Sequence, residues 1–352
     1  MESESTTDRT EVLVDPGHGV GPEVTEGIIR ILNEADSSLR MEKRSLSSTL
    51  SPDHHSSSVP ESTEKIRSFQ ALLKGPYISQ YRPQTTTVSN QLSNTLSLES
   101  SVQKFRTYPY SSSDQSRKVD LVLLHQNTDR EDPLRSSDFS AWSEFSSGSF
   151  RHLCRLACDY ASAHERDRVA CAYRKNNEIA SDIFDSISTD YSSLASSHLL
   201  LSTVSEELAN HPERFDVLLL TETHSSVFKV LDHLLNGRLK FSPIAHVGET
   251  FGIFGPRHGP MPDIAGEGMA DPTGLLRSTL LMLDYVGHHS TAKVVHNAWH
   301  KTIEDGFRLP FTYNNDSDEK LVDTVTFIDS VVERLGESAS ELSPIKYSEY
   351  WD

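Results

Sequence analysis

The stretch GETFGIFGPRHGPMPDIAGEGMADPT, residues 248–273, decides the fold of this chain. Glycine and proline recur so densely along it that it predicts a shaped loop, because neither a helix nor a strand tolerates that density. Asp271 is the expected N-cap of a following helix, with Pro272 at its first position. Apolar residues then recur at helical spacing until Gly287 closes the run. A glycine-rich loop that leads into a helix N-terminus can present backbone N–H groups to an anion.

The N-terminal part of the chain shows the order strand, glycine-rich turn and helix. Residues 12–14 predict a short buried strand, residues 16–23 read PGHGVGPE, and an amphipathic helix is expected from Val24 to Ala35. This order is typical of the start of an α/β domain. The glycine spacing differs from Gly-x-Gly-x-x-Gly, so it does not predict a Rossmann dinucleotide-binding turn. Further elements are expected as buried strands at 119–124, 169–172 and 215–220, and as helices at 62–74, 150–164 and 322–335.

Composition narrows the class of protein. The chain has 352 residues, enough for one large or two medium domains, and a formal net charge of −18. So acidic a chain is not expected to bind nucleic acid, whose phosphates attract Lys and Arg. It contains no run of about 18 apolar residues, so no membrane span is expected. Three cysteines do not suggest a disulfide framework, which fits a reducing compartment.

The glycine-rich loop resembles that of the isocitrate/isopropylmalate dehydrogenase family, whose members carry His-Gly-x-x-Pro-Asp-Ile-Ala-Gly-x-x-x-Ala-Asn-Pro-Thr. Here residues 258–266 read HGPMPDIAG and residues 270–273 read ADPT. The flank GETFGIF, residues 248–254, is similar to the isocitrate branch, especially its mitochondrial NAD-dependent subunits. The PGHGVGPE turn is similar too, with His18 in place of a family Asp. The likeness covers most of the chain and thins over residues 77–118.

The resemblance implies an α/β architecture, the two-domain isocitrate/isopropylmalate dehydrogenase-like fold with a central cleft. The large domain would comprise residues 1–108 and 248–352, and the small domain residues 109–247. The arm that clasps a partner subunit in the family looks shortened near residues 133–149. The partners implied are homologous dehydrogenase subunits, in a homo- or hetero-oligomer.

The resemblance also implies that the loop holds the adenosine half of a dinucleotide. The residues at the family's cofactor positions are His258, Gly259, Asp263, Ile264 and Asp271. His258 would contact adenine, and Asp263 would accept a hydrogen bond from the ribose 2′-hydroxyl and repel a 2′-phosphate. Family members that use NADP carry Lys and Tyr where this loop has Asp263 and Ile264, so NAD is the expected cofactor. Asp271 replaces a family Asn and adds a charge near the base.

Most of the residues with which the family binds its substrate are replaced in this sequence. Three family arginines bind the substrate carboxylates, a task that suits the planar guanidinium. The corresponding positions hold Leu98, Tyr108 and His125. Asn94 keeps a family substrate position, whereas Arg106 is near the second arginine position but out of register.

The family's proton-transfer and metal-binding groups are replaced as well. Its acid/base Lys falls on Arg174, a nearby family Asn is kept as Asn176, and its proton-donating Tyr falls on Asp132. An Arg is not expected to cycle its proton, because its pKa is roughly 12 or above. The family binds Mg²⁺ or Mn²⁺ through Asp carboxylates, the hard oxygen ligands that these cations prefer. The three metal positions hold Ser202, Ser226 and Val230.

Three functions stay open on this sequence. The first is a catalytically silent subunit, structural or regulatory, of an NAD-dependent isocitrate dehydrogenase of the tricarboxylic acid cycle. The second is an active NAD-dependent decarboxylating dehydrogenase, its site rebuilt by nearby Lys175, Glu222, Asp232 or Arg106. The third is a diverged binding or scaffold protein. The resemblance implies a mitochondrial location, but the acidic N-terminus shows no transit peptide, which leaves a cytoplasmic location open.

Overall fold

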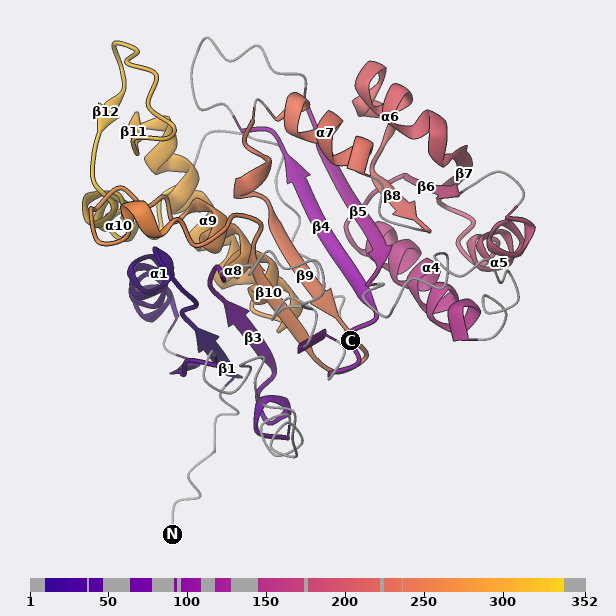
Figure 1. Cartoon of the computed structure of the whole chain (residues 1–352), viewed down its shortest axis with the longest axis horizontal. Coiled ribbons are helices and arrows are strands. Elements are labelled where there is room, and N and C mark those ends of the chain that lie inside the picture. Colours follow the sequence, from indigo (N-terminus) through magenta and orange to yellow (C-terminus); the bar gives the residue numbers. More distant parts are fainter. Residues whose placement is uncertain are drawn as a thin grey trace.

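The computed structural model describes residues 10–36, 38–46, 64–77, 92–93, 96–108, 118–127, 145–173, 177–221, 225–235 and 237–338. Ten strands form one mixed sheet in the order β2-β1-β3-β10-β9-β4-β5-β8-β6-β7 (Figure 1). Helices cover both of its faces, so the predicted α/β fold is confirmed. The strands are β1 (Thr10–Asp15), β2 (Leu39–Lys43), β3 (Ala71–Lys74), β4 (Ser100–Arg106), β5 (Asp120–Gln126), β6 (Arg168–Tyr173), β7 (Ala195–Leu200), β8 (Val217–Leu220), β9 (Pro243–Val247) and β10 (Gly252–Pro256).

The helices follow the strands in a largely alternating order. They are α1 (Gly21–Ala35), α4 (Phe145–Ala163), α5 (Glu178–Ser188), α6 (Leu201–Asn210), α7 (Ser225–Leu234), α8 (Thr273–Tyr285), α9 (His289–Glu304) and α10 (Thr324–Glu333). A two-stranded ribbon, β11 (Phe307–Arg308) with β12 (Lys320–Leu321), lies beyond α9. None of the helices in the described part of the chain is long and apolar enough to cross a membrane.

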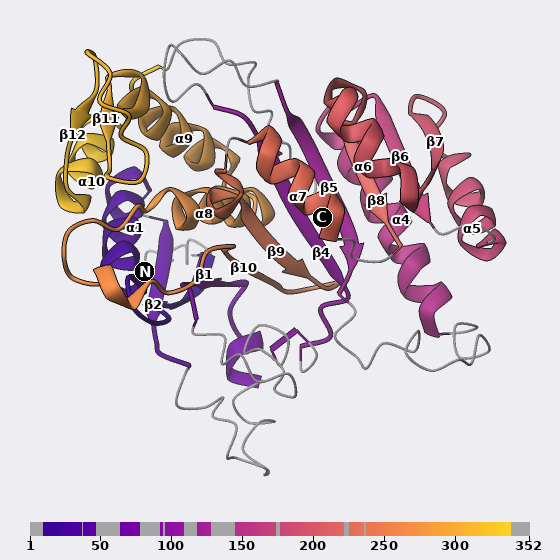
Figure 2. The same cartoon turned by 45° about the horizontal axis from the view of Figure 1, so that its top comes forward.

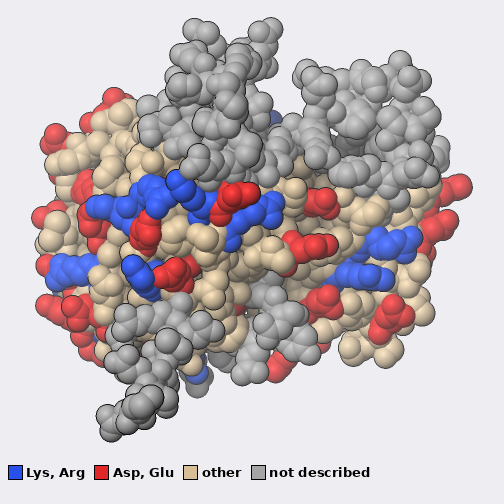
Figure 3. Space-filling view, turned by 90° about the horizontal axis from the view of Figure 1, so that it is seen from below, with Lys and Arg blue, Asp and Glu red and all other residues tan. Residues whose placement is uncertain are grey.

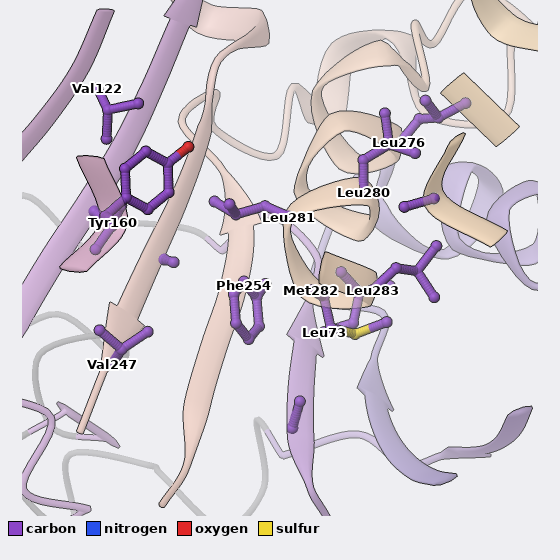
Figure 4. Close-up of a cluster of buried hydrophobic side chains, with 14 of the residues drawn as sticks. Leu73, Val122, Tyr160, Val247, Phe254, Leu276, Leu280, Leu281, Met282 and Leu283 are labelled. Carbon is purple, nitrogen blue, oxygen red and sulfur yellow. The ribbon is translucent and has the colours of Figure 1, made fainter. Parts of the chain in front are cut away.

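The helix α8 is the centre of the larger core. Every residue from Thr273 to Asp284 is buried, and Figure 4 shows its side chains facing Phe254 on β10 and Leu73 on β3. Gly287 follows with φ +80°, and the His288 N–H donates to Leu283 O at 2.8 Å, which ends the helix as predicted. The glycine-rich loop is therefore anchored at its C-terminal end by the most enclosed helix of the fold.

One prediction from sequence is wrong over half its length. Among the described residues of the expected helix at 62–74, only 64–67 are helical, and Ala71–Lys74 is the strand β3. This strand is parallel to both β1 and β10 and lies inside the sheet. Leu72 and Leu73 face opposite cores, so the run is buried on both sides. A short apolar run of this kind cannot be assigned to a strand or a helix from periodicity alone.

The predicted domain layout is compatible with the strand pairing. β5 and β8, both assigned to the small domain, are parallel neighbours. β4 is antiparallel to β5 on one side and to β9 on the other, so a single sheet runs through both parts. The boundaries near residues 109 and 248 stay a prediction. The proposed clasp arm near 133–149 lies outside the described residues, except for its last five, which begin α4.

The charged surface is mixed in sign on the face that Figure 3 shows. Lys and Arg side chains form a band there, and acidic side chains interrupt it. The expectation that the chain does not bind nucleic acid stays a prediction.

Candidate functional site

The β1–α1 turn and the glycine-rich loop are joined through their backbones. The Val20 N–H donates to Pro260 O of the loop at 2.8 Å, and on its other side the turn is bonded to the segment after β3, where the His18 N–H donates to Pro76 O at 2.7 Å. Farther along the loop, the Gly266 N–H donates to the carboxylate of Glu23 at 3.2 Å. Figure 2 shows the loop passing beside α1. The two motifs that carry the family resemblance therefore form one structural unit.

Gly19 makes this contact possible, and replacing it should destabilise the chain. Gly19 has φ +59°, and a Cβ built there would lie 1.9 Å from Pro260 O. We expect Gly19→Ala to lower the free energy of unfolding by about 3 kcal/mol, through left-handed backbone strain plus displacement of the loop. Gly287→Ala is the matched control, since Gly287 also has positive φ but its Cβ would meet nothing within 4 Å. Its cost should be about 1 kcal/mol in urea unfolding, and equal costs would contradict the close contact.

The predicted cofactor residues divide into exposed and buried groups. Gly259 and Asp263 are exposed, and Ile264 is half-buried against the larger core. His258 is buried, with Nδ1 2.9 Å from Gly259 O and Nε2 without a partner among the described residues. Burial lowers the pKa of His258, so its ring is neutral at pH 7. Asp271 is also buried, and burial raises the pKa of its carboxyl.

The prediction that Asp271 is the N-cap of α8 is wrong by one residue, because α8 begins at Thr273 and Pro272 is its N-cap, but the Asp271 side chain still contacts the start of the helix. Its Oδ1 accepts a hydrogen bond from the Thr273 N–H at 2.9 Å, and Thr273 is the first helical residue. The carboxylate is thus occupied by the helix N-terminus. Asp263 is exposed, and its contact with a ribose, like the contact between His258 and adenine, stays a prediction.

A line of polar side chains crosses one face of the central sheet. On the opposite face, the same strands contribute Val102, Leu124 and Ala245 to the larger core. Successive side chains of a strand point to opposite faces, and Ser101 of β4 is paired with both His125 of β5 and His246 of β9. We call the following set the polar row: Asp15, Lys74, Ser101, Gln103, His125 and His246.

Hydrogen bonds at one end of the polar row make His125 neutral. Its Nδ1 lies 2.8 Å from Gln126 O and therefore carries the proton, so Nε2 accepts from Gln103 Nε2 at 3.0 Å. Gln103 Oε1 in turn accepts a hydrogen bond from Arg257 Nη1. Burial lowers the pKa of His125, and nearby Arg257 lowers it further. The ring at the position that the resemblance assigns to a family substrate arginine is therefore uncharged, with both nitrogens engaged.

The other end of the polar row holds a carboxyl, a phenol and an amine. Tyr77 donates its hydroxyl hydrogen to Asp15 Oδ2, and the Gly17 N–H donates to Asp15 Oδ1 at 3.2 Å. Burial lowers the pKa of Lys74 to about 8, and the attraction of Asp15 opposes this shift. Burial also raises the pKa of Asp15. The sequence did not indicate this group, because Asp15 and Lys74 come together only through the parallel pairing of β1 with β3.

The other two predicted substrate-arginine positions hold uncharged side chains. Leu98 is buried in a separate apolar cluster. Tyr108 belongs to the larger core, where its ring lies 4.8 Å from that of Trp299 on α9. Arg106 and Val102 are four residues apart on β4, so they lie on the same face of the strand. That face is opposite the one that carries Gln103. Arg106 therefore does not rebuild the substrate grip around His125. Asn94, Asp132, Arg174, Lys175, Asn176 and Glu222 lie outside the described residues.

The residues that the resemblance places at the family's metal positions, Ser202, Ser226 and Val230, offer no carboxylate. Ser202 is exposed, and Ser226 Oγ lies 2.5 Å from Ser205 Oγ. Val230 packs against the apolar cluster that contains side chains of α6 and α7. Nearby Asp232 accepts a hydrogen bond from the Leu239 N–H at 3.3 Å. Within the described ranges, no group of three or more His, Cys, Asp or Glu side chains is arranged to hold a metal ion.

Fold, loop and sheet together are those of an α/β dehydrogenase. A family model described as isocitrate/isopropylmalate dehydrogenase matches residues 11–331, and the chain belongs to that family. It is 28% identical over 350 residues to the NADP isocitrate dehydrogenase of Rickettsia bellii, covering 96% of this chain and 72% of that protein. It is 27% identical over 316 residues to a mitochondrial regulatory subunit of the NAD isocitrate dehydrogenase of Dictyostelium discoideum, covering 86% and 87%.

Solved structures agree with the assignment of the fold. Isocitrate dehydrogenase from Methylococcus capsulatus superposes with a TM-score of 0.77 at 21% identity, covering 93% of this chain and 99% of that chain. A protein of Thermus thermophilus superposes with a TM-score of 0.82 at 25% identity, covering 98% and 72%. These structures confirm the predicted fold, and the family model confirms the predicted family. Family members are oligomeric dehydrogenases that use NAD or NADP with Mg²⁺ or Mn²⁺, and the relatives named here include both an NADP enzyme and an NAD regulatory subunit.

Proposed function

We propose that this chain is a catalytically silent subunit of an NAD-dependent isocitrate dehydrogenase, with a structural or regulatory role. The observation that carries the proposal is the replacement of the metal carboxylates by Ser202, Ser226 and Val230. The hydroxyl of Ser226 is hydrogen-bonded to Ser205, and Val230 packs among apolar side chains. A decarboxylating dehydrogenase needs a cation there to stabilise the developing enolate as a Lewis acid.

The substrate side supports the same proposal. His125 is neutral and Tyr108 is a core residue, so neither meets a substrate carboxylate with a fixed positive charge. The sequence of the dinucleotide loop matches the family pattern, and the backbone of the loop is hydrogen-bonded to the β1–α1 turn. Retention of the fold and loop together with loss of the chemical groups favours a partner role over an independent enzyme. The 27% identity to a regulatory subunit described as mitochondrial supports a mitochondrial location as part of this proposal.

Co-purification with an intact homologous subunit tests the partner role. We expect the chain to form a stable hetero-oligomer with a catalytic subunit from the same source and to change its maximal rate or its apparent affinity for isocitrate. Light scattering after gel filtration gives the stoichiometry, and initial rates with and without the chain give the effect. Complete absence of association would favour a diverged binding or scaffold protein instead.

NAD should bind the loop more tightly than NADP. The exposed Asp263 carboxylate would repel a 2′-phosphate and accept from a 2′-hydroxyl, a difference of about tenfold or more in affinity. Asp263→Lys should weaken or invert this preference in calorimetric titrations. Glu267→Lys is the matched control, because Glu267 is an exposed acid of the same loop, and it should leave the preference unchanged. Equal affinity of the unmodified chain for both dinucleotides would argue against the assignment to NAD.

A further inference from the structure

A second group of polar side chains lies at the end of β1 that is remote from the glycine-rich turn. Thr10 is the first residue of β1, Asp36 directly follows α1, and His288 lies between α8 and α9. The turn begins after Asp15 at the other end of the strand, roughly 17 Å from Thr10 at about 3.3 Å per residue. This group is therefore separate from the contact between the turn and the predicted dinucleotide loop.

Hydrogen bonds join these three side chains in one line. His288 Nδ1 lies 2.9 Å from Asp36 Oδ2, and His288 Nε2 lies 2.8 Å from Thr10 Oγ1. An ionised carboxylate only accepts hydrogen bonds, so the single N–H of a neutral imidazole is on Nδ1. The lone pair of Nε2 then accepts the hydroxyl proton of Thr10. A hydroxyl nucleophile, its general base and an orienting carboxylate are hydrogen-bonded in this order in catalytic triads.

The carboxylate of Asp36 is held ionised and in a fixed orientation. Its Oδ1 accepts from the Ser38 N–H at 2.8 Å and from the Ser38 hydroxyl at 2.6 Å, and its Oδ2 accepts from the Thr291 hydroxyl at 2.6 Å. Burial acts to raise the pKa of Asp36, but its hydrogen bonds, first those from Ser38 and Thr291, lower the pKa overall. An ionised carboxylate fixes the tautomer of His288 and stabilises the imidazolium that forms when the ring takes up a proton.

The partner of the second ring nitrogen distinguishes His288 from another histidine that is paired with aspartate. His164 Nε2 lies 3.2 Å from Asp284 Oδ2, but its Nδ1 lies 2.9 Å from the backbone oxygen of Tyr160, which has no proton to donate. On His288 the second partner is a hydroxyl, which becomes a nucleophile when its proton is removed.

The three side chains lie at the rim of the larger core. Thr10 is 9% exposed, and the side chains of His288 and Asp36 beside it are 16% and 17% exposed. The hydroxyl is therefore close to the surface but largely enclosed, which favours a small acyl group such as acetyl over a long one.

We propose that Thr10 is a nucleophile toward small activated carboxylic esters, with His288 as its general base and Asp36 as a positioning residue. Thr10 Oγ1 attacks the carbonyl carbon while its proton passes to His288 Nε2. The bond from Oγ1 to carbon forms, the bond from carbon to the leaving oxygen breaks, and the proton passes from His288 to that oxygen. The products are an acyl ester of Thr10 and a free alcohol or phenol. An ester with an acidic leaving group fits, because such a group departs readily. This chemistry is independent of the proposed silent role of the dehydrogenase site.

Reaction of the isolated full chain with p-nitrophenyl acetate tests this directly. We expect an acetyl group on Thr10, located by mass spectrometry of peptides from acid-quenched samples. Release of p-nitrophenolate, followed by its absorbance and corrected for spontaneous hydrolysis, gives the rate. Acetyl groups confined to lysine side chains, with p-nitrophenolate released as fast by folded Thr10→Val as by the unmodified chain, would overturn the proposal.

Variants at the other positions assign the general base. His288→Gln should slow acetylation of Thr10 at least about a hundredfold, because the proton acceptor is lost. His198→Gln is the matched control, since His198 Nε2 also lies 2.7 Å from an aspartate, Asp185, and it should react normally. Melting curves verify folding, and equal acetylation of Thr10 in folded His288→Gln would exclude His288 as the base. If Thr10→Val or His288→Gln does not fold, Thr10→Ser keeps the hydroxyl and must still gain an acetyl group at position 10. Its absence there contradicts the proposal.

The positioning role of Asp36 has a readout that a purely structural role would leave unchanged. In Asp36→Asn the amide oxygen should remain on the Ser38 N–H, which needs an acceptor, so the amide N–H₂ faces His288 Nδ1. The ring proton then moves to Nε2, which no longer accepts the proton of Thr10. We expect the nitrogen chemical shifts of the two ring nitrogens to exchange their order and acetylation to fall at least about tenfold. Unchanged shifts and unchanged acetylation would show that Asp36 does not set the tautomer.

Discussion

The isolated chain should oxidise isocitrate no faster than background, with either dinucleotide and with Mg²⁺ or Mn²⁺. Three charge-assisted hydrogen bonds to substrate carboxylates are absent where the family arginines are replaced by Leu98, Tyr108 and His125. Each is worth roughly 1.5–3 kcal/mol, so their loss costs on the order of a thousand-fold or more in substrate binding. The missing metal carboxylates add a further loss in the chemical step.

These groups act as a unit, so restoring one of them should recover nothing measurable. Arg174→Lys restores the family's acid/base residue in name but leaves the substrate and the metal unbound. The measurement is the initial rate of formation of the reduced dinucleotide, followed by its absorbance, with an intact family enzyme as the positive control. Isocitrate oxidation by the unmodified chain that disappears in Arg174→Ala would favour the rebuilt active site over the silent role.

We expect the free energy of unfolding to fall at mildly acidic pH, because histidine side chains are buried in their neutral form. His296 is 5% exposed, and burial lowers its pKa to about 3, with His300, Arg106 and Lys104 adding repulsion. His246 in the polar row has a pKa lowered to about 3 for the same main reason, burial. The sign of this pH dependence follows from the number of protons that the folded and the unfolded chain bind. Above about pH 6.5 the ring is neutral in both states, but between about 6.5 and 3 the unfolded chain binds a proton that the folded chain refuses.

Stability is therefore lost as the pH falls, by about 1.4 kcal/mol per pH unit for each such histidine. From about pH 6.5 to about 4.5 the share of His296 alone is about 3 kcal/mol, a large part of the roughly 5–15 kcal/mol typical of a folded domain. Urea unfolding at a series of pH values should show that His296→Gln reduces this slope by about 1.4 kcal/mol per pH unit, whatever its effect on absolute stability. His211→Gln, at an exposed position, is the control and should leave the slope unchanged. An unchanged slope in His296→Gln would show that the ring is already protonated or exposed in the folded state.

The sequence by itself determined the fold class and the family, because both depend on local signals. Each of these signals depends on contiguous residues. They are the glycine- and proline-rich loop, the buried helix after it and the strands at 12–14, 119–124, 169–172 and 215–220. The error at Ala71–Lys74 has a physical cause. A four-residue apolar run has no distinct periodicity, and only its pairing with β1 and β10 makes it a strand.

The candidate site was decided by tertiary structure, because its members are far apart in sequence. Ser101, His125 and His246 become neighbours only through the antiparallel register of β4 with β5 and β9. Nothing in the sequence distinguishes Arg257 from its neighbours in the loop. Only the structure places its guanidinium beside Gln103 and the ring of Phe228. Likeness to a family assigns positions along the chain, but which face of a strand a residue occupies, and which charges are left without partners, follows from how the strands pair and the helices cover them.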